Sequence, residues 1–320
     1  MPRTLIRSNP SNFKTLSLLV EATPEGLGYE SIGMPLNFAQ TLQRRRKIEV
    51  PDTERFTVEL ANLGVSIRLT LSWQNRDYWV LVRQRRKDRG DVVLKLISGY
   101  VPAHELALPL HTAIQEVAEE CLIETPQGWL SGRYKDTWLP APYAAALHYR
   151  EAMPFRLSPL SGAALPVRCG SQALLERPRA YVHLPTASLQ LIYDMRLEIP
   201  REARPVSLFH VDESLEDQHL VARLNRSKPD LYLMPLENGN PLPELYTLKR
   251  DRLTPVGTRG LYLAESFARQ DGWVVSEERI RWKDWLRQQG LTPPPKNTGL
   301  TRLTGKAREL LQRARSRLAK

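Results

Sequence analysis

The sequence predicts an α/β or α+β fold built around a mixed β-sheet, and three observations carry this prediction. Residues 65–73 and 78–84 alternate apolar and polar side chains, which is the two-residue period of a β-strand. Residues 109–123 instead place apolar side chains three and four positions apart, as an amphipathic helix does. Strand-like segments return at 189–199 and 206–211. Strands that alternate with helices favour this fold class.

The elements before residue 109 form a simple order along the chain. A strand is expected at 15–20, and a helix is expected to run from Asn37 into the basic residues 44–47. The two alternating segments, joined by residues 74–77, form a plausible hairpin. The apolar segment 91–97 predicts a further strand, which ends at Ser98 and Gly99.

Residues 124–186 lack a clear period and are rich in proline and aromatic side chains. A loop of this length is unusual in a compact domain. We therefore expect an insertion at about 124–188, interrupted by a short helix at 142–151. Such an insertion can cover a site or contact a partner, but it can also lack either role.

The remaining segments complete the expected organisation. Helices are predicted at 214–225 and 278–289, and short strands at 230–236 and 272–276. The prolines of 292–299 indicate an extended linker, and 304–320 can form a basic helix. The predicted division is an N-terminal segment, 1–60, that packs on or extends a domain at 61–290, followed by the linker and basic helix at 291–320.

Composition and charge narrow the class of protein. The chain has 320 residues, of which 42% are hydrophobic, and a formal net charge of +11. No stretch approaches the roughly 18 apolar residues of a membrane-spanning helix, and the first residues do not resemble a secretory signal. A cytoplasmic location without membrane association is the expectation. Cys121 and Cys169 have no metal-ligand spacing, so buried structural thiols are expected.

An acidic cluster on the predicted helix 109–123 is the strongest candidate for chemistry. Glu116, Glu119 and Glu120 lie at positions i, i+3 and i+4, so their carboxylates project from neighbouring points of one helical face. Like charges in this arrangement repel. Either nearby basic side chains pair with them, or a hard divalent cation binds their oxygens.

The residues before this helix favour the second alternative. A strand ends in Gly99, Glu105 follows, and the acidic helix comes next. This order resembles the signature of the Nudix hydrolase superfamily, G-x5-E-x7-R-E-U-x-E-E-x-G-U, where U is a bulky aliphatic residue. The matching positions are Gly99, Glu105, Glu116, Val117, Glu119, Glu120 and Ile123. The resemblance, with its flanking strands, covers about 45 residues.

The match departs from the signature at three points. Nine residues rather than seven separate Glu105 from the next motif position, Gln115 stands at the arginine, and Leu122 stands at the second glycine. The longer loop leaves the glutamates in phase with one another. Gln115 can still donate a hydrogen bond to a carboxylate, but it lacks the charge and the bidentate fork of arginine.

The resemblance implies a site and a chemistry. Glu116, Glu119, Glu120 and the Gly99 carbonyl would bind Mg²⁺ or Mn²⁺, and Glu105 and Gln115 would support the motif. Bound cations neutralise the charge of a diphosphate and lower the pKa of an attacking water. Glu116 is the candidate proton acceptor, and Glu116 and Glu120 together are the candidate catalytic residues. Four acids are open as a further catalytic group: Glu198, Asp212, Glu213 and Glu216.

The basic end of the chain suggests a polyanion as a second partner. Lysine and arginine gain affinity for nucleic acid by releasing condensed counterions. Residues 297–320 hold seven basic side chains against the single acid Glu309, but no aromatic ring for base stacking. A solvated helix or a protein-docking arm is the alternative. The candidate nucleic-acid contacts are Arg302, Lys306, Arg308, Arg313, Arg315 and Arg317.

The sequence therefore predicts a Nudix-like mixed sheet sandwiched between helices. Two functions are expected of a protein with this fold and motif. The first is a hydrolase that cleaves a phosphoanhydride of a nucleoside diphosphate derivative with a divalent metal. The alternative is a Nudix-fold module with weakened catalysis that senses a nucleotide or binds nucleic acid or a protein. A third possibility, a nucleic-acid-associated protein of a mobile or phage-like element, rests only on the basic end.

Overall fold

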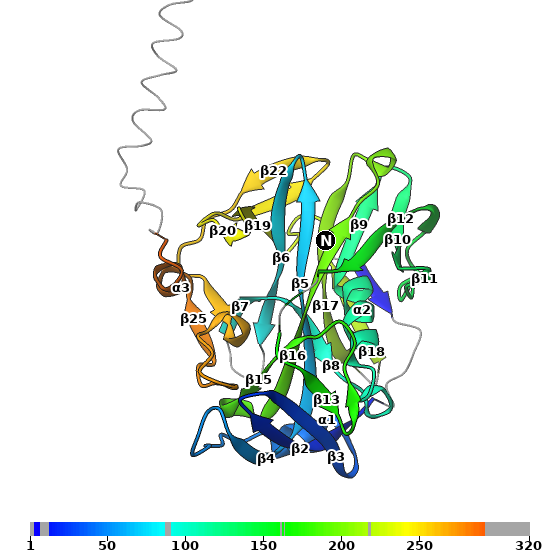
Figure 1. Cartoon of the computed structure of the whole chain (residues 1–320). Coiled ribbons are helices and arrows are strands. Elements are labelled where there is room, and N and C mark those ends of the chain that lie inside the picture. Colours follow the sequence, from blue (N-terminus) through cyan, green and yellow to red (C-terminus); the bar gives the residue numbers. More distant parts are fainter. Residues whose placement is uncertain are drawn as a thin grey trace, which may run out of the picture.

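The computed structural model describes residues 3–6, 13–86, 91–160, 162, 164–216 and 219–291 of the chain. In these ranges strands predominate: one extended sheet has 20 strands, a second has five, and three α-helices accompany them. Figure 1 shows the long strands of the large sheet upright, with the small sheet across their lower end. The fold class is α+β, with mixed sheets.

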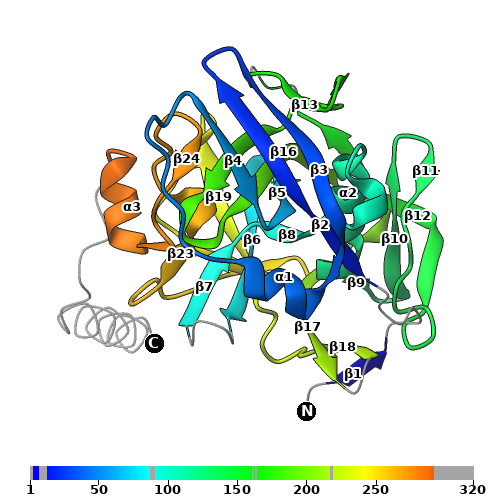
Figure 2. The ribbon, with the colours of Figure 1, turned by 90° about the horizontal axis from the view of Figure 1, so that it is seen from below.

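The small sheet is formed mainly by the first sixty residues, in the order β14-β13-β3-β2-β4. Its strands are β2 (Lys14–Thr23), β3 (Gly26–Asn37), β4 (Phe56–Leu60), β13 (Val167–Cys169) and β14 (Gln172–Ala173). Helix α1 (Phe38–Arg44) begins directly after β3, because Asn37 and Gln40 cap its first turn reciprocally. In Figure 2 this sheet lies in front of β5, β8 and β16.

The centre of the large sheet is the hairpin of β5 (Asn62–Trp73) and β6 (Arg76–Arg86). Gln74 and Asn75 both have positive φ, as a two-residue hairpin turn requires. On its other edge β5 pairs in parallel with β16 (Ser188–Glu198) from Asn62↔Ser188 to Leu71↔Leu197. Residues more than a hundred positions apart therefore form the middle of the molecule.

The other strands extend this centre on both sides. Those before β16 are β1 (Arg3–Ile6), β7 (Asp91–Lys95), β8 (Ile97–Tyr100), β9 (Cys121–Thr125), β10 (Gly128–Tyr134), β11 (Thr137–Trp138), β12 (Tyr149–Pro159) and β15 (Arg179–His183). Those after it are β17 (Ser207–Glu216), β18 (His219–Leu224), β19 (Leu231–Glu237), β20 (Asn240–Pro241), β21 (Tyr246–Lys249), β22 (Arg252–Pro255), β23 (Tyr262–Ala264), β24 (Val274–Val275) and β25 (Arg279–Arg281).

The two faces of the large sheet carry different layers. Helix α2 (Pro109–Glu120) packs with the small sheet on the face of Val65 and Ile67, in one continuous core. Helix α3 (Trp282–Gln288) packs with Leu81 and Ile192 in a second core. Alternate residues of a strand face opposite ways, so α2 and α3 cover opposite faces.

Several predicted elements are confirmed. The hairpin, the strands at 15–20 and 189–199 and the helix after Asn37 are present. The predicted helix 109–123 is α2, which ends at Glu120, and the apolar face expected of it is buried. Proline at the first helical position costs no hydrogen bond there, so α2 begins at Pro109 without a capping side chain.

Two predicted helices are wrong. Of the range 214–225, expected to be helical, residues 214–216 belong to β17 and residues 219–224 form β18; the two strands pair antiparallel, and β18 also pairs with β1. Residues 142–147 form turns, and β12 begins at Tyr149 where the helix 142–151 was expected. The irregular insertion expected at 124–188 instead contains strands, because β12 completes the sheet beside β10 and β16. Pairing with distant strands outweighs local propensity in both places.

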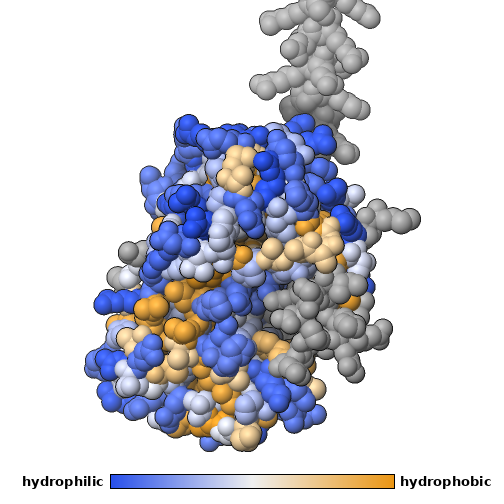
Figure 3. All heavy atoms as spheres, turned by 90° about the vertical axis from the view of Figure 1, so that its right-hand side faces the viewer, coloured by the Kyte–Doolittle hydropathy of each residue, from blue (hydrophilic) through white to orange (hydrophobic). Residues whose placement is uncertain are grey.

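The surface is mixed in character. Figure 3, a view from the right-hand side of Figure 1, shows apolar residues scattered among polar ones, with a larger group in the lower half. The large apolar side chains that are exposed are Met34, Phe38, Leu42, Leu108, Trp138, Leu165 and Leu175. In the described ranges no helix has the length and apolar character needed to span a bilayer.

Candidate functional site

The predicted motif lies where β8, the short helix η1 (Ala103–Glu105) and α2 follow one another. Strand β8 pairs antiparallel with β5, so that Gly99 lies opposite Val65. Val65 faces the core that contains α2. Opposed residues of an antiparallel pair point to the same side of the sheet, so Gly99 presents its α-carbon to α2.

Glu116 lies directly over Gly99. A Cβ placed on Gly99 would overlap the Glu116 carboxylate at both oxygens and at Cδ. The contact therefore requires glycine at position 99, because any side chain would displace either the carboxylate or the helix. Two residues that lie seventeen positions apart in the sequence are thus brought into contact.

Glu120 is paired with a lysine that the sequence analysis did not single out. The Lys95 ammonium lies 3.4 Å from Glu120 Oε1, and the two side chains are only 11% and 14% exposed. Lys95 Nζ also donates to the Ser98 carbonyl at 3.3 Å and to the Ser98 hydroxyl at 2.9 Å. A buried cation at the end of β7 thus contacts Ser98 of β8, the neighbour of Gly99, and the last residue of α2.

The sequence contained a signal for this lysine. Residues 91–97 are apolar except for Asp91 and Lys95, and Lys95 interrupts the apolar run two residues before β8. Lysine is almost never fully buried unless it is paired. A lysine inside a strand that approaches an acidic helix is therefore a candidate partner for that helix.

Glu119 occupies a different environment from its neighbours. The residue is 4% exposed, and its backbone carbonyl accepts a hydrogen bond from the buried Tyr143 hydroxyl at 3.3 Å. His210 of β17 lies close by, with Nδ1 3.3 Å from the Glu120 carbonyl. The end of α2 is therefore enclosed by residues from two later segments, neither of which has a motif signal.

Glu105 joins the loop to the first turns of α2. Its Oε1 lies 2.7 Å from His111 Nδ1, and its Oε2 accepts a hydrogen bond from the Thr112 hydroxyl at 2.5 Å. Gln115 Nε2 lies 3.3 Å from the other nitrogen of His111. Glu105 and Gln115 are thus connected through one imidazole rather than directly.

The three glutamates of α2 lie in different surroundings. Among the residues that the structure describes, no group of three or more histidine, cysteine, aspartate or glutamate side chains is arranged to hold a metal ion. Glu116 faces Gly99, Glu120 faces Lys95, and Glu119 is buried.

The four acids that the sequence left open as a further catalytic group lie on β16 and β17. Glu198 is exposed at the end of β16 and lies opposite Arg156. Strand β17 pairs with β9 as far as His210. The other three acids, Asp212, Glu213 and Glu216, come later in β17, where it pairs with β18. The orientations of these three side chains lie outside the described part of the structure.

Burial controls the thiol at the end of α2. Cys121 is enclosed in the core, and this burial, reinforced by the charge of Glu120, raises the pKa of its thiol to about 12. Cys169 is half-buried, and burial raises the pKa of its thiol too. Neither cysteine is in a disulfide. Protonated thiols at neutral pH are poor nucleophiles, which agrees with a structural role.

The basic end of the chain, with all six candidate nucleic-acid contacts from Arg302 to Arg317, lies outside the described residues.

Comparison with models of protein families, with curated proteins and with solved structures finds no match to this chain.

Proposed function

We propose that the chain is a Nudix-like module that binds a nucleoside diphosphate derivative and has lost efficient phosphoanhydride cleavage. The observation that carries this proposal is the buried ion pair of Lys95 and Glu120. The ammonium group stands where the resemblance to the Nudix signature would put a divalent cation against the same carboxylate.

Electrostatics supports a loss of metal-dependent chemistry. A Mg²⁺ ion on Glu120 would lie close to the Lys95 ammonium, and at low effective dielectric two cations repel strongly. Lys95 is also held by Ser98, which follows β7 and precedes Gly99, so it cannot leave without breaking two further hydrogen bonds. As arranged, with the Lys95 ammonium against Glu120, these donors do not fit a metal ion.

The layering of the molecule supports the Nudix-like part of the proposal. A mixed sheet with α2 on one face and α3 on the other agrees with the helix-sheet-helix arrangement that the resemblance implies. The glycine contact of Glu116 gives a reason for glycine at the start of the motif. Fold alone does not establish activity, so the site residues must be tested directly.

Active hydrolysis is the second candidate function, and the Gly99–Glu116 contact favours it. The motif glycine and the first helical glutamate are in register despite a loop two residues longer than in the signature. If a bound diphosphate and Mg²⁺ or Mn²⁺ displaced Lys95 from Glu120, the carboxylates of α2 would become available as ligands.

The two functions are separated by measuring binding and turnover on the same panel. The purified full chain is incubated with a nucleotide sugar, a dinucleoside polyphosphate and ADP-ribose, with Mg²⁺, with Mn²⁺ or with EDTA. Calorimetry measures binding, and chromatography measures release of mononucleotide. The binding module predicts affinity for at least one compound, with release no faster than in the Glu120→Gln variant.

Glu237→Gln is the matched control, because Glu237 is an exposed glutamate at the end of β19. Metal-dependent release that survives Glu237→Gln and disappears in Glu120→Gln would establish the hydrolase and refute the loss of catalysis. If no compound of the panel is bound or cleaved, both nucleotide functions are wrong.

A further inference from the structure

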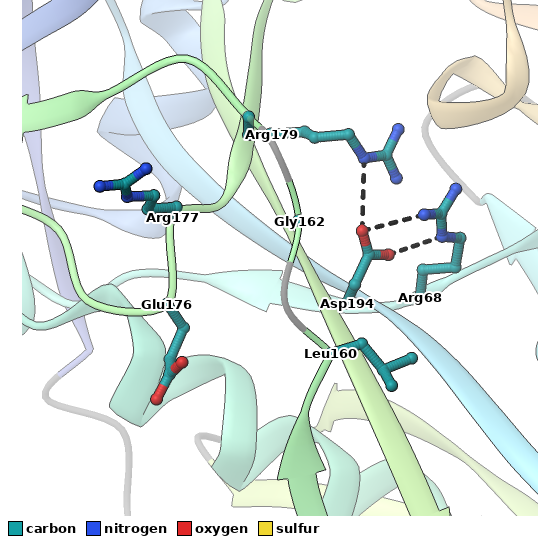
Figure 4. A pocket seen from close by; sticks show the side chains of 8 residues that line it. Arg68, Leu160, Gly162, Glu176, Arg177, Arg179 and Asp194 are labelled. Atoms are coloured by element: carbon teal, nitrogen blue, oxygen red, sulfur yellow. Dashed lines mark hydrogen bonds and ion pairs between the residues drawn. The ribbon is translucent and has the colours of Figure 1, made fainter.

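We propose that a cavity around Arg68 and Arg179 binds a small phosphate-bearing anion with an apolar substituent. This site goes beyond the proposed function, because it shares no residue with the cluster around α2. The cavity has a volume of about 250 Å³ and lies where β5, β16 and the start of β15 meet. Figure 4 shows the side chains that line it.

Two guanidinium groups converge on one carboxylate in this cavity. Arg68 holds Asp194 in a bidentate pair, Nε to Oδ1 at 2.6 Å and Nη2 to Oδ2 at 2.9 Å. Arg179 approaches from the other side, with its Nε 3.6 Å from Asp194 Oδ2 (Figure 4). At that distance the second contact is an ion pair but not a hydrogen bond.

Arg179 consequently has an unsatisfied donor. Its Nε is buried and makes no hydrogen bond to any group among the described residues. Burial, and then the neighbouring charge of Arg68, lower the pKa of Arg179. Both effects oppose a charged guanidinium at this point, and a second anion, bound in the cavity beside Asp194, would offset both.

The balance of charge around the cavity is positive. Arg68, Arg177 and Arg179 line it, against the carboxylates of Asp194 and Glu176. Glu176 is already engaged, because it accepts hydrogen bonds from the Tyr134 hydroxyl and from Lys135, each at 3.0 Å. Asp194 is the only other carboxylate among these lining residues, so a positive excess faces the cavity.

The geometry of the donors selects the class of ligand. Guanidinium groups match the oxygens of phosphate and carboxylate, with two donors directed at one anion. A second cavity, of about 300 Å³, shares Arg179 and Ala164 with the first. Its lining includes Pro24, Leu165 and Trp273 beside the polar Glu54 and Gln270, so it offers apolar surface next to the guanidinium. A phosphate ester with an apolar group can use both cavities.

The site is separate from the acidic cluster of α2. Val65, Ile67 and Leu69 of β5 face the core that contains α2. Arg68 lies between two of them in the strand and points to the opposite face. A substitution of Arg179 therefore tests this anion site without disturbing Glu116 or Glu120. If the anion site is refuted, the proposed function of the α2 cluster is unaffected.

Phenyl phosphate is the probe, and calorimetry on the full chain in EDTA is the measurement. We expect one molecule bound per chain, with inorganic phosphate bound more weakly. Arg179→Gln should lower the affinity about 10- to 100-fold, since a hydrogen bond to a charged group is lost. Arg287→Gln is the matched control, because Arg287 is an exposed arginine of α3 with one acidic partner. It should leave the affinity unchanged.

Protection from phenylglyoxal tests the site without any substitution. Arg68 and Arg179 are 32% and 40% exposed at their side chains, so the reagent can reach them. Phenyl phosphate should slow the modification of Arg179, read by mass spectrometry of peptides, and should not slow that of Arg287. Absence of binding, or equal effects of Arg179→Gln and Arg287→Gln, would overturn the site. Equal affinities for phosphate and phenyl phosphate would overturn the part played by the second cavity.

Discussion

The carboxylate of Glu116 occupies the space that a side chain at position 99 would need, so it can lie there only because residue 99 is glycine. This contact couples the start of the motif to its acidic half through packing. It also implies that a larger residue at position 99 lowers the stability of the folded chain.

Gly99→Ala should displace the Glu116 carboxylate and destabilise the folded chain by about 1 kcal/mol, the low end of the usual cost of overpacking, because only the end of a flexible side chain must move. The matched control is Gly28→Ala, because a Cβ at Gly28 meets no atom within 4 Å. Chemical denaturation of both variants is the measurement. A loss no greater at Gly99 than at Gly28 would contradict the close approach of Glu116.

Lys95→Met should destabilise the protein by roughly 3–5 kcal/mol, because it removes one partner of a buried ion pair and leaves the charge of Glu120 enclosed without its lysine. Glu120→Gln should cost less than Lys95→Met. The double variant should show a coupling of about 0.5–3 kcal/mol in a double-mutant cycle of urea unfolding. Additive losses would show that the two groups do not interact; Lys249→Met, at an exposed lysine, is the control.

The buried thiol of Cys121 predicts a pH dependence. Its folded-state pKa, about 12, lies above the ordinary value of 9.0 expected in the unfolded chain. The stabilising contribution is therefore complete below pH 9 and is lost as the pH rises toward 12, where the unfolded chain binds fewer protons.

This contribution is checked by comparing the wild type with Cys121→Ala between pH 8 and pH 12. The difference in unfolding free energy should shrink as the pH rises. In the folded wild type Cys169, which is half-buried, should react with a thiol reagent before Cys121 does. Simultaneous reaction of both thiols in the native protein would be inconsistent with a closed environment around Cys121.

The basic end of the chain gives a prediction about polyanions. Deleting residues 301–320 removes seven basic side chains and one acid, which is more than half of the net charge of +11. If this segment is a nucleic-acid arm, the deletion should weaken binding to duplex DNA and lower the slope of log K against log salt concentration. Fluorescence anisotropy at several salt concentrations measures both. Unchanged affinity and slope would assign DNA binding, if any, to the rest of the chain.

Local patterns predicted the elements that depend on neighbouring residues. The alternation of 65–73 and 78–84 predicted the central hairpin, and the spacing of Leu110, Ala113 and Val117 predicted the buried face of α2. The period of apolar side chains is a property of a short segment, so it can be detected before the partner of that segment is known.

Elements defined by a distant partner were missed. Residues 214–225 resemble a helix in isolation, but β18 pairs with β1 at Arg3–Ile6, more than two hundred residues away. Residues 142–159 look irregular until β10 and β16 provide edges for β12. Strand formation there depends on hydrogen bonds that no local window contains.

Local spacing is enough to predict the order of strand, glycine and acidic helix, because the period of a helix places Glu116, Glu119 and Glu120 on neighbouring points of one face. What each carboxylate meets depends on the packed chain: the α-carbon of Gly99, the buried interior, or the ammonium of Lys95. Only the packed chain brings Arg68 and Arg179 to one aspartate. The interaction energy of two charges depends on their distance in space. That distance is set by the folded chain, whose packing is driven mainly by burial of apolar side chains elsewhere in the molecule.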